Sequence, residues 1–468
     1  MRNLRSIAVL ALICLTTPLR GEERAQPVPD LRSRSEGVDW PGFLGASGDS
    51  KSPERGILTK WPAAGPKLVW QRRLGDGYAM PSVSRGRLFV FDRVNDNARL
   101  ACLHSETGHL LWEFKYKTDY EDLYGYSNGP RCCPVIDDER VYLYGAEGLL
   151  HCLRVTDGRL IWKVDTVATF GVVQNFFGVG STPVVEGDQL VVQVGGSTPE
   201  TQDVAPGRLN EVASNGTAVV AFDKFTGQVR FRAGDELASY ASPILATIDQ
   251  RRWCFVFARG GLLGLNPTDG RIDFHYPWRS RKLESVNASN PVVVGNEVFI
   301  SETYGPGSSL LAISKRGFKV VWQDDPSRRA KAMQTHWNTP IQIDGFLYGS
   351  SGRHTQTAEL RCIAWKSGKI QWSVPGLERC SLLYVDGHFV CLSEYGKLRL
   401  LRVNPQRYEM VAETTLSEDD PGEAKRLLRY PAWAAPILSH GLLYVRGRDR
   451  LICLELIPAD RLPGKSKP

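Results

Sequence analysis

The sequence predicts an all-β fold: a single β-propeller of eight blades, in which each blade is a four-stranded antiparallel sheet. Three observations predict it. A pattern of short strands recurs along the chain, the recurring units share their turn residues, and the last unit lacks a strand that a spare segment near the start can supply. Repetition at about 40–50 residues is typical of such ring-shaped architectures.

The repeat is plainest in the first three units. Residues 80–112 read "MPSVSRGRLFVF…ARLACLHSETGHLLW", residues 133–162 read "CPVIDDERVYLY…GLLHCLRVTDGRLIW", and residues 182–231 read "TPVVEGDQLVVQ…TAVVAFDKFTGQVRF". Weaker copies begin at Ser242, Asn290, Thr339, Ser381 and Ala435. Together they make eight units.

Each unit contains the signals of four strands. A proline opens the first strand in most units, where a missing backbone N–H is tolerated. These prolines are Pro81, Pro134, Pro183, Pro243, Pro291, Pro340 and Pro436. A pair such as Asp344-Gly345 then supplies the positive φ of a tight hairpin. After strands two and three, a Thr-Gly or Asp-Gly pair leads into a fourth strand that often carries Trp.

The last unit, which begins at Ala435, has only three strands. Residues 66–74, "PKLVWQRRL", form a strand with Trp70 that belongs to no unit. We expect this N-terminal strand to pair with residues 435–457, because closing the ring removes an open sheet edge.

The ends of the chain differ from the repeats in composition. Arg2 and Arg5 precede a short apolar run, which predicts a secretory signal peptide and a periplasmic or extracellular protein. The next segment is charged and carries prolines, which predicts a disordered lead. The expected organisation is a signal peptide at 1–21, a disordered lead at 22–39, an N-terminal arm at 40–65, the propeller at 66–458 and a tail at 459–468.

The charge balance is close to even. The formal net charge of +7 falls to +4 once Arg2, Arg5 and Arg20 leave with the predicted signal peptide. So small an excess on a long chain does not indicate a nucleic-acid partner. No segment after the signal peptide is apolar enough to span a membrane, and we expect a monomer.

The units resemble those of a known family. The pattern Leu-x-Cys-Leu, a Gly turn and Trp at residues 100–112 and 150–162 is similar to the repeats of quinoprotein-type propellers. These include the PQQ-dependent alcohol dehydrogenases and the BamB-like propeller of the outer-membrane assembly machinery. The opening at residues 40–70 resembles that of exported planctomycete-type propellers. The resemblance covers residues 40–458, and it specifies a fold better than a chemistry.

Four cysteines share one position in the third strand, where other units carry alanine or glycine. They are Cys102, Cys152, Cys362 and Cys453. A position that accepts only small side chains is tightly packed, so we expect these thiols to be reduced and buried.

Cys132 and Cys133 stand side by side before a strand-one proline, and two interpretations are open. Either they are small side chains at a crowded strand start, or they form a vicinal disulfide at the channel mouth, as the resemblance to the dehydrogenases implies. Those enzymes also need a bound calcium and an aspartate base, a context that "TDYEDLY" at residues 118–124 does not reproduce. We expect no cofactor, with PQQ and calcium as the alternative.

The loops that enter strand one, or join strands two and three, gather around the channel at one face of a propeller. Here they supply amides, arginines, histidines and aromatic rings. The candidate binding residues are Asn128, Arg131, Asn175, Asn287, Asn290, Glu302, Tyr304, His336, Asn338, Arg353, His354 and Trp433. Such groups suit a polar ligand with a flat or carbohydrate-like face. The alternative is that they cap strand ends and bind water.

We therefore predict an exported, non-catalytic binding or scaffold protein that recognises a polar small molecule, a carbohydrate or a protein partner. An enzyme using the same face is the alternative. Residue types would also allow a metal site at His336, His354 and Glu302, or an acid pair at Glu284 and Glu302. No close spacing supports either, and we expect no metal.

Overall fold

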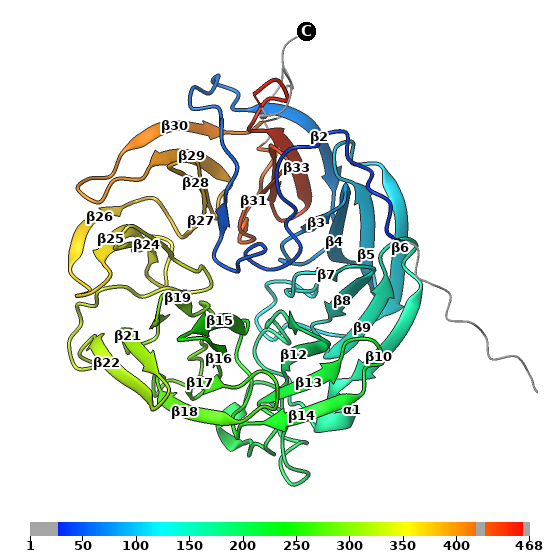
Figure 1. The fold of residues 1–468 in the computed structure, drawn as a ribbon, viewed down its shortest axis with the longest axis vertical. Helices are drawn as coiled ribbons and strands as arrows, with labels where there is room; N and C mark the ends of the chain where they lie inside the picture. The colour runs from blue at the N-terminus through cyan, green and yellow to red at the C-terminus, as the bar shows by residue number, and fades with distance from the viewer. Residues whose placement is uncertain (1–26, 418–425, 462–468) are drawn as a thin grey trace, which may run out of the picture.

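The computed structural model describes residues 27–417 and 426–461, and the predicted all-β fold is confirmed in them. The strands form eight sheets that stand radially around a central axis (Figure 1). In the described ranges, helical structure is limited to α1 (Thr166–Phe170) and the 3-10 turn η1 (Leu209–Glu211). The predicted signal peptide and most of the tail lie outside the described residues.

None of the helices in the described part of the chain is long and apolar enough to cross a membrane.

Each blade is an antiparallel meander that runs from the channel to the rim (Figure 1). The first blade comprises β3 (Ser82–Ser84), β4 (Arg87–Val94), β5 (Asn97–His104) and β6 (Leu110–Lys117). The second comprises β7 (Val135–Asp137), β8 (Arg140–Tyr144), β9 (Leu149–Arg154) and β10 (Leu160–Asp165). The third comprises β11 (Val184–Glu186), β12 (Gln189–Gln193), β13 (Val219–Asp223) and β14 (Val229–Ala233). The fourth comprises β15 (Ile244–Ile248), β16 (Arg251–Phe257), β17 (Gly261–Leu265) and β18 (Ile272–Pro277).

The remaining blades repeat this order. The fifth comprises β19 (Val292–Val294), β20 (Glu297–Glu302), β21 (Gly307–Ser314) and β22 (Gly317–Gln323). The sixth comprises β23 (Ile341–Ile343), β24 (Phe346–Ser351), β25 (Glu359–Ala364) and β26 (Ile370–Pro375). The seventh comprises β27 (Cys380–Val385), β28 (His388–Ser393), β29 (Lys397–Arg402) and β30 (Met410–Thr415). The eighth comprises β31 (Ile437–Ser439), β32 (Leu442–Arg446), β33 (Arg450–Glu455) and the N-terminal strand β2 (Lys67–Arg73).

The ring closes as the sequence predicts. Strand β2 pairs antiparallel with β33, and Trp70 lies opposite Cys453. The expected turn conformation is also present, since Asp344 and Gly345 have φ values of 48° and 84°. The N-terminal strand therefore covers the sheet edge that the last blade would otherwise leave open.

Indole rings on the outermost strands join one blade to the next. Trp70 donates from Nε1 to the carbonyl of Ser105 at 2.9 Å, which links the eighth blade to the first. Trp112 donates likewise to Val155, from the first blade to the second. A Cβ on Gly108 would lie only 2.8 Å from the Trp70 ring. The Gly turn therefore gives the indole room as well as supplying a positive φ.

A second set of contacts links the inner ends of the blades. At four strand starts, the residue before the strand-one proline accepts a hydrogen bond from the backbone N–H of its counterpart in the preceding blade. The backbone N–H of Cys133 donates to Thr182, that of Thr182 to Ser242, that of Ser242 to Asn290, and that of Asn290 to Thr339. This belt satisfies donors at strand starts that the sheets leave unpaired.

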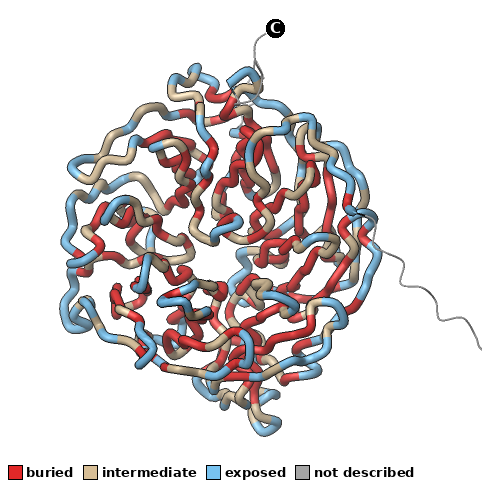
Figure 2. Tube along the Cα trace, in the orientation of Figure 1, coloured by how far each residue is buried: buried red, intermediate tan, exposed pale blue. Residues whose placement is uncertain are grey.

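Burial is highest on the second and third strands of the blades and lowest on the fourth strands (Figure 2). Cys102, Cys152, Cys362 and Cys453 are free thiols at 0% exposure, which confirms the prediction made from their repeat position.

The N-terminal arm at residues 40–65 joins a blade, a pairing that the sequence did not predict. Strand β1 (Lys51–Ser52) pairs in parallel with β27, the innermost strand of the seventh blade. The seventh unit has no strand-one proline, so its N–H groups are free to pair, and that of Tyr384 donates to Ser50. The arm thus lies on the channel side of the seventh blade (Figure 1).

The prediction of a disordered lead at 22–39 is wrong for its described part, residues 27–39. Arg34 forms an ion pair with Glu455 and donates to the carbonyl of Ile457. Ser33 donates its backbone N–H to Glu106. Charge-assisted hydrogen bonds hold this segment, a source of order that a low content of large apolar residues does not reveal.

Candidate functional site

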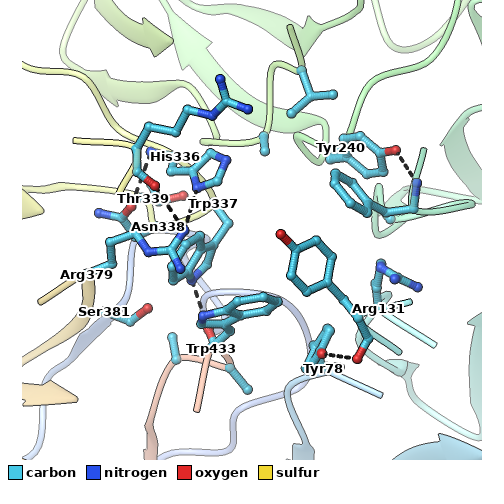
Figure 3. Close-up of a pocket in the computed structure, with 18 of the residues that line it drawn as sticks. Tyr78, Arg131, Tyr240, His336, Trp337, Asn338, Thr339, Arg379, Ser381 and Trp433 are labelled. Atoms are coloured by element: carbon cyan, nitrogen blue, oxygen red, sulfur yellow. Dashed lines mark hydrogen bonds between the residues drawn. The ribbon is translucent and has the colours of Figure 1, made fainter. Parts of the chain in front are cut away.

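A cavity of about 490 Å³ opens at the channel mouth, at the face where the loops entering strand one gather (Figure 3). Those loops bring Arg131, Tyr240, His336 and Trp433 to one space. The arm adds Phe43 and Leu44 to its wall, so the cavity combines propeller loops with the segment that lies along the seventh blade.

Aromatic rings surround much of this space. Trp433 lies 4.8 Å from Tyr78, 5.1 Å from Trp337 and 5.5 Å from Tyr126, measured between ring centroids. Phe177 lies 6.0 Å from Tyr126. These residues come from five separate loops, and Figure 3 shows Trp433 between Trp337 and Tyr78. Rings in this arrangement offer several faces to a flat ligand.

Arg131 is fixed across the cavity from Trp337, next to Tyr78 (Figure 3). Its guanidinium forms an ion pair with Asp122 at 3.1 Å, and the Asp122 side chain has 0% exposure. The same group lies over the rings of Tyr78 and Phe177, 5.9 Å from each centroid. Its charge is therefore already balanced within the protein.

Arg379 is held in the same way beneath the two tryptophans. It forms a bidentate ion pair with Glu394, whose side chain has 0% exposure. Glu394 also accepts a hydrogen bond from the Trp433 indole at 3.0 Å. Burial alone would raise the pKa of Glu394, but the hydrogen bonds from Arg379 and Trp433 outweigh it and lower the pKa. Glu394 thus orients both a cation and a ring of the cavity.

His336 connects Arg379 to Tyr304. Its Nδ1 lies 3.4 Å from Nη1 of Arg379, and its Nε2 lies 3.2 Å from the Tyr304 hydroxyl. Burial, together with the charges of Arg379 and Arg353, lowers the pKa of His336 to about 3. The imidazole is neutral at physiological pH, and both its nitrogens are engaged.

The structure places part of the predicted residue set in this cavity. The predicted residues that line it are Arg131, Tyr304, His336, Asn338, Arg353, His354 and Trp433. The others, Asn128, Asn175, Asn287, Asn290 and Glu302, lie outside its lining. Asn290 belongs to the belt of strand-start hydrogen bonds, and Asn287 donates to the carbonyl of Ala258. For these amides the alternative interpretation, capping of backbone groups, describes their contacts.

Asn128 and Asn175 also serve the loops themselves. Asn128 accepts from the backbone N–H of Asp122 at 2.9 Å, and Asn175 accepts from that of Phe176. Asn175 lines a neighbouring cavity of about 650 Å³ between the second and third blades.

Glu302 lies behind the cavity wall. It accepts a hydrogen bond from Ser285 at 3.0 Å, while its Oε2 has no partner among the described residues. Burial raises the pKa of Glu302 to about 7. It does not approach His336 and His354 as a metal ligand, because in the described ranges no group of three or more His, Cys, Asp or Glu side chains is placed to hold a metal ion.

Cys132 and Cys133 do not line the channel rim, where the sequence placed them. Both are free thiols with 0% exposure. Cys132 packs among the residues of the second and third blades, whereas Cys133 packs toward the first and eighth. Consecutive side chains of an extended segment point to opposite sides, so the two sulphurs enter separate cores and form no disulfide here.

The donor set of the cavity does not fit a calcium-bound quinone. Asp122 and Glu394, the buried acids behind its wall, are already taken by Arg131 and Arg379, and Glu284 is the one carboxylate among the described residues that line it. The paired cysteines that the resemblance implied lie outside its lining.

Sequence reasoning missed several cavity residues. Tyr78, Phe177 and Tyr240 lie in loops that enter strand one, but their rings carried no repeat signal. Arg379 precedes the one strand-one segment without a proline, and the seventh loop was therefore not recognised. The absence of that proline was the usable signal.

Known proteins with the same fold are similar to this chain. A family model described as outer membrane protein assembly factor BamB matches residues 54–196 and 96–374. Among solved structures, BamB from Moraxella catarrhalis is 12% identical, with a TM-score of 0.54 over 83% of this chain and 97% of that chain. Quinohemoprotein alcohol dehydrogenase from Comamonas testosteroni is 13% identical, with a TM-score of 0.50 over 92% and 82%.

The computationally designed Ika8 protein is 10% identical, with a TM-score of 0.50 over 84% of this chain and 100% of that chain. At these identities the structures share a fold with this chain. No curated protein sequence matches it.

Proposed function

The chain belongs to the propeller family of the outer membrane protein assembly factor BamB, and from this premise we propose that it is an exported binding protein. Its ligand is polar, carries a flat or carbohydrate-like face, and enters the cavity at the channel mouth. The ligand is free or forms part of a protein partner.

The observation that carries this proposal is the aromatic cavity itself. Trp337 and Trp433 are fixed at its wall, since the Trp337 indole donates to the carbonyl of Trp433 and the Trp433 indole donates to Glu394. Rings held rigidly lose little conformational entropy when a ligand stacks on them. A preformed apolar wall with a few oriented polar groups is the usual form of a small-molecule site.

Binding is favoured over catalysis by the state of the titratable groups. A general base works best when its pKa lies near the operating pH, and His336, with a pKa of about 3, does not meet that condition. Asp122 and Glu394 are ion-paired structural groups. His336, Asp122 and Glu394 are thus engaged in holding the cavity.

Export is part of the proposal. The predicted signal peptide supports it, as does the family's namesake, which is an outer membrane protein assembly factor. Fractionation of cells producing the full chain tests this directly: a cytoplasmic product of uncut length would contradict it.

Intrinsic tryptophan fluorescence tests the binding function. The purified protein is titrated with a panel of neutral and charged saccharides, amino acids and nucleotides, and with pyrroloquinoline quinone plus calcium. A saturable change that is lost in Trp433→Phe but kept in Trp61→Phe supports the proposal, because Trp61 bonds to Leu58 in the arm and does not line the cavity. Stoichiometric quinone binding with substrate-dependent dye reduction would replace the proposal by the dehydrogenase alternative. A flat response to the whole panel would refute a preformed small-molecule site.

A further inference from the structure

We propose that the cavity recognises an acidic saccharide, and that its carboxylate or sulfate docks between the Arg353 guanidinium and the Tyr304 hydroxyl. This deepens the proposed function, on which it rests, by naming the ligand class and the place where its charge is held.

The first argument is the direction of the hydrogen bonds that lead to Tyr304. Arginine has only donors, so the contact of Arg379 Nη1 with His336 Nδ1 makes that nitrogen an acceptor. In a neutral imidazole the other nitrogen then carries the proton. His336 Nε2 therefore donates to the Tyr304 oxygen, 3.2 Å away.

The Tyr304 proton is consequently left for a different acceptor. No other hydrogen bond of the Tyr304 hydroxyl is present among the described residues. Burial raises the pKa of Tyr304 to about 12, so the hydroxyl keeps its proton at physiological pH. Tyr304 lines the cavity, and its O–H is thus a donor that a ligand oxygen can accept from.

The second argument is the position and charge of Arg353. Its guanidinium lies over the Tyr304 ring, 4.3 Å from the centroid. In contrast to Arg131 and Arg379, it has no ion-pair partner among the described residues. A guanidinium that stacks through its face keeps its N–H edge available. Arg353 and Tyr304 therefore make a subsite that contains donors and a positive charge held in no ion pair of the described residues, while Glu284 lines the same cavity.

Such a subsite selects an oxyanion. A carboxylate or sulfate presents acceptors only, and its hydrogen bonds to a guanidinium are charge-assisted. A cationic ligand would meet the charge of Arg353 in a partly buried cavity, where like-charge repulsion is screened little. The aromatic rings consequently serve here as platforms for the faces of an anionic ligand, and not as a cage for a cation.

The remaining wall of the cavity favours a saccharide as the ligand. The ring centroids of Tyr78 and Tyr126 lie 4.8 Å and 5.5 Å from that of Trp433. The three rings provide faces on which the C–H surface of a pyranose can lie. Thr355 and Gln356 add polar groups to the lining. An apolar face with polar groups at its edge matches a saccharide ring better than a uniformly apolar ligand.

Isothermal titration of the full purified chain tests this with two matched pairs of trisaccharides. One pair is trigalacturonate and its methyl ester, and the other is a sulfated galactotriose and galactotriose. We expect the charged member of at least one pair to bind about tenfold tighter at low salt, the effect of one charge-assisted contact. The pair that shows the preference identifies the oxyanion as a carboxylate or a sulfate. Salt at 0.5 M should reduce the preference for the charged member.

Variants then locate the charge. Arg353→Gln and Tyr304→Phe should each remove most of the preference for the charged member. Arg328→Gln, at an exposed loop site outside the cavity, is the matched control and should keep it. Equal binding of charged and neutral members, or a preference that survives Arg353→Gln, overturns the inference but leaves a saccharide site in place. Failure of all four saccharides also overturns it, and a hit from another class in the fluorescence panel would then still uphold the proposed function.

Discussion

Exchange of Glu394 for glutamine should destabilise the propeller and disorder one wall of the cavity. The substitution keeps the size of the side chain but removes the charge that balances Arg379. Both side chains are strongly buried, at 0% and 11% exposure, so water cannot replace the lost partner. Removing one member of a buried ion pair costs about 3–5 kcal/mol, because the other charge is left unpaired.

The expected shift in melting temperature is small because the chain is long. An unfolding entropy of about 2.1 cal/mol/K per residue gives about 1 kcal/mol/K for a chain of 468 residues. The variant should therefore melt about 3–5 °C lower in differential scanning calorimetry at pH 7. Glu409→Gln is the control, since Glu409 pairs with arginines at the surface, and it should melt like the wild type.

A further variant separates the ion pair from a general loss of packing. Arg379→Gln combined with Glu394→Gln leaves no unpaired charge, so the double variant should melt higher than Glu394→Gln alone. The wild-type contribution of Glu394, whose pKa is lowered in the folded protein, is present above the ordinary carboxyl pKa and lost as the pH falls through the folded value. A wild-type melting temperature for Glu394→Gln at pH 7 would refute the assignment of this pair as the support of the wall.

Three more outcomes are expected. Deletion of residues 22–75 removes both β1 and β2 and should abolish cooperative unfolding, so an unchanged melting transition would refute closure by the N-terminal strand. Cys102, Cys152, Cys362 and Cys453 should resist alkylation until the protein is denatured, and Cys132→Ala with Cys133→Ala should keep the fold; rapid native labelling of the four would contradict the packing described. Burial raises the pKa of Glu302 to about 7. The contribution of Glu302 to the free energy of unfolding is therefore fully present below the ordinary carboxyl pKa, and it is lost as the pH rises through 7. Glu302→Gln should therefore gain about 3 °C on the wild type between pH 5 and pH 8, and a constant difference would show that Glu302 is ionised in the fold.

The fold was predictable because its signals repeat. A proline before strand one, a Gly turn before strand four and a Trp within strand four each have a local physical cause. Each recurs often enough to reveal the blade. The spare strand with Trp70, together with the missing fourth strand of the last unit, was sufficient to predict how the ring closes. The parallel pairing of β1 was not predictable from the repeat, because it depends on the single blade that departs from it.

The candidate site was predictable only in part, for a different reason. Loop position shows which residues gather at one face, and on this basis Arg131, His336 and Trp433 were placed near the channel. It does not show whether a polar side chain faces the cavity or the backbone of the next blade. Asn287 and Asn290 have the backbone as partner, and sequence cannot distinguish these two directions.

Which arginines of the cavity are ion-paired could not be predicted from the sequence either. The sequence offers Arg131, Arg353 and Arg379 as equivalent cations, but only the structure pairs two of them with Asp122 and Glu394. The difference between a supporting arginine and a binding arginine therefore depends on contacts between loops that are far apart in the chain.

Hydrogen–deuterium exchange with and without a ligand found by the fluorescence panel tests the central claim most directly. If the cavity at the channel mouth is the binding site, protection on ligand addition will increase in residues 120–131, 173–181, 334–339 and 429–435, which supply its walls. The outermost strands, such as β6 and β10, will exchange as before. Protection confined to those outer strands, with no change in the four loop segments, would contradict the account.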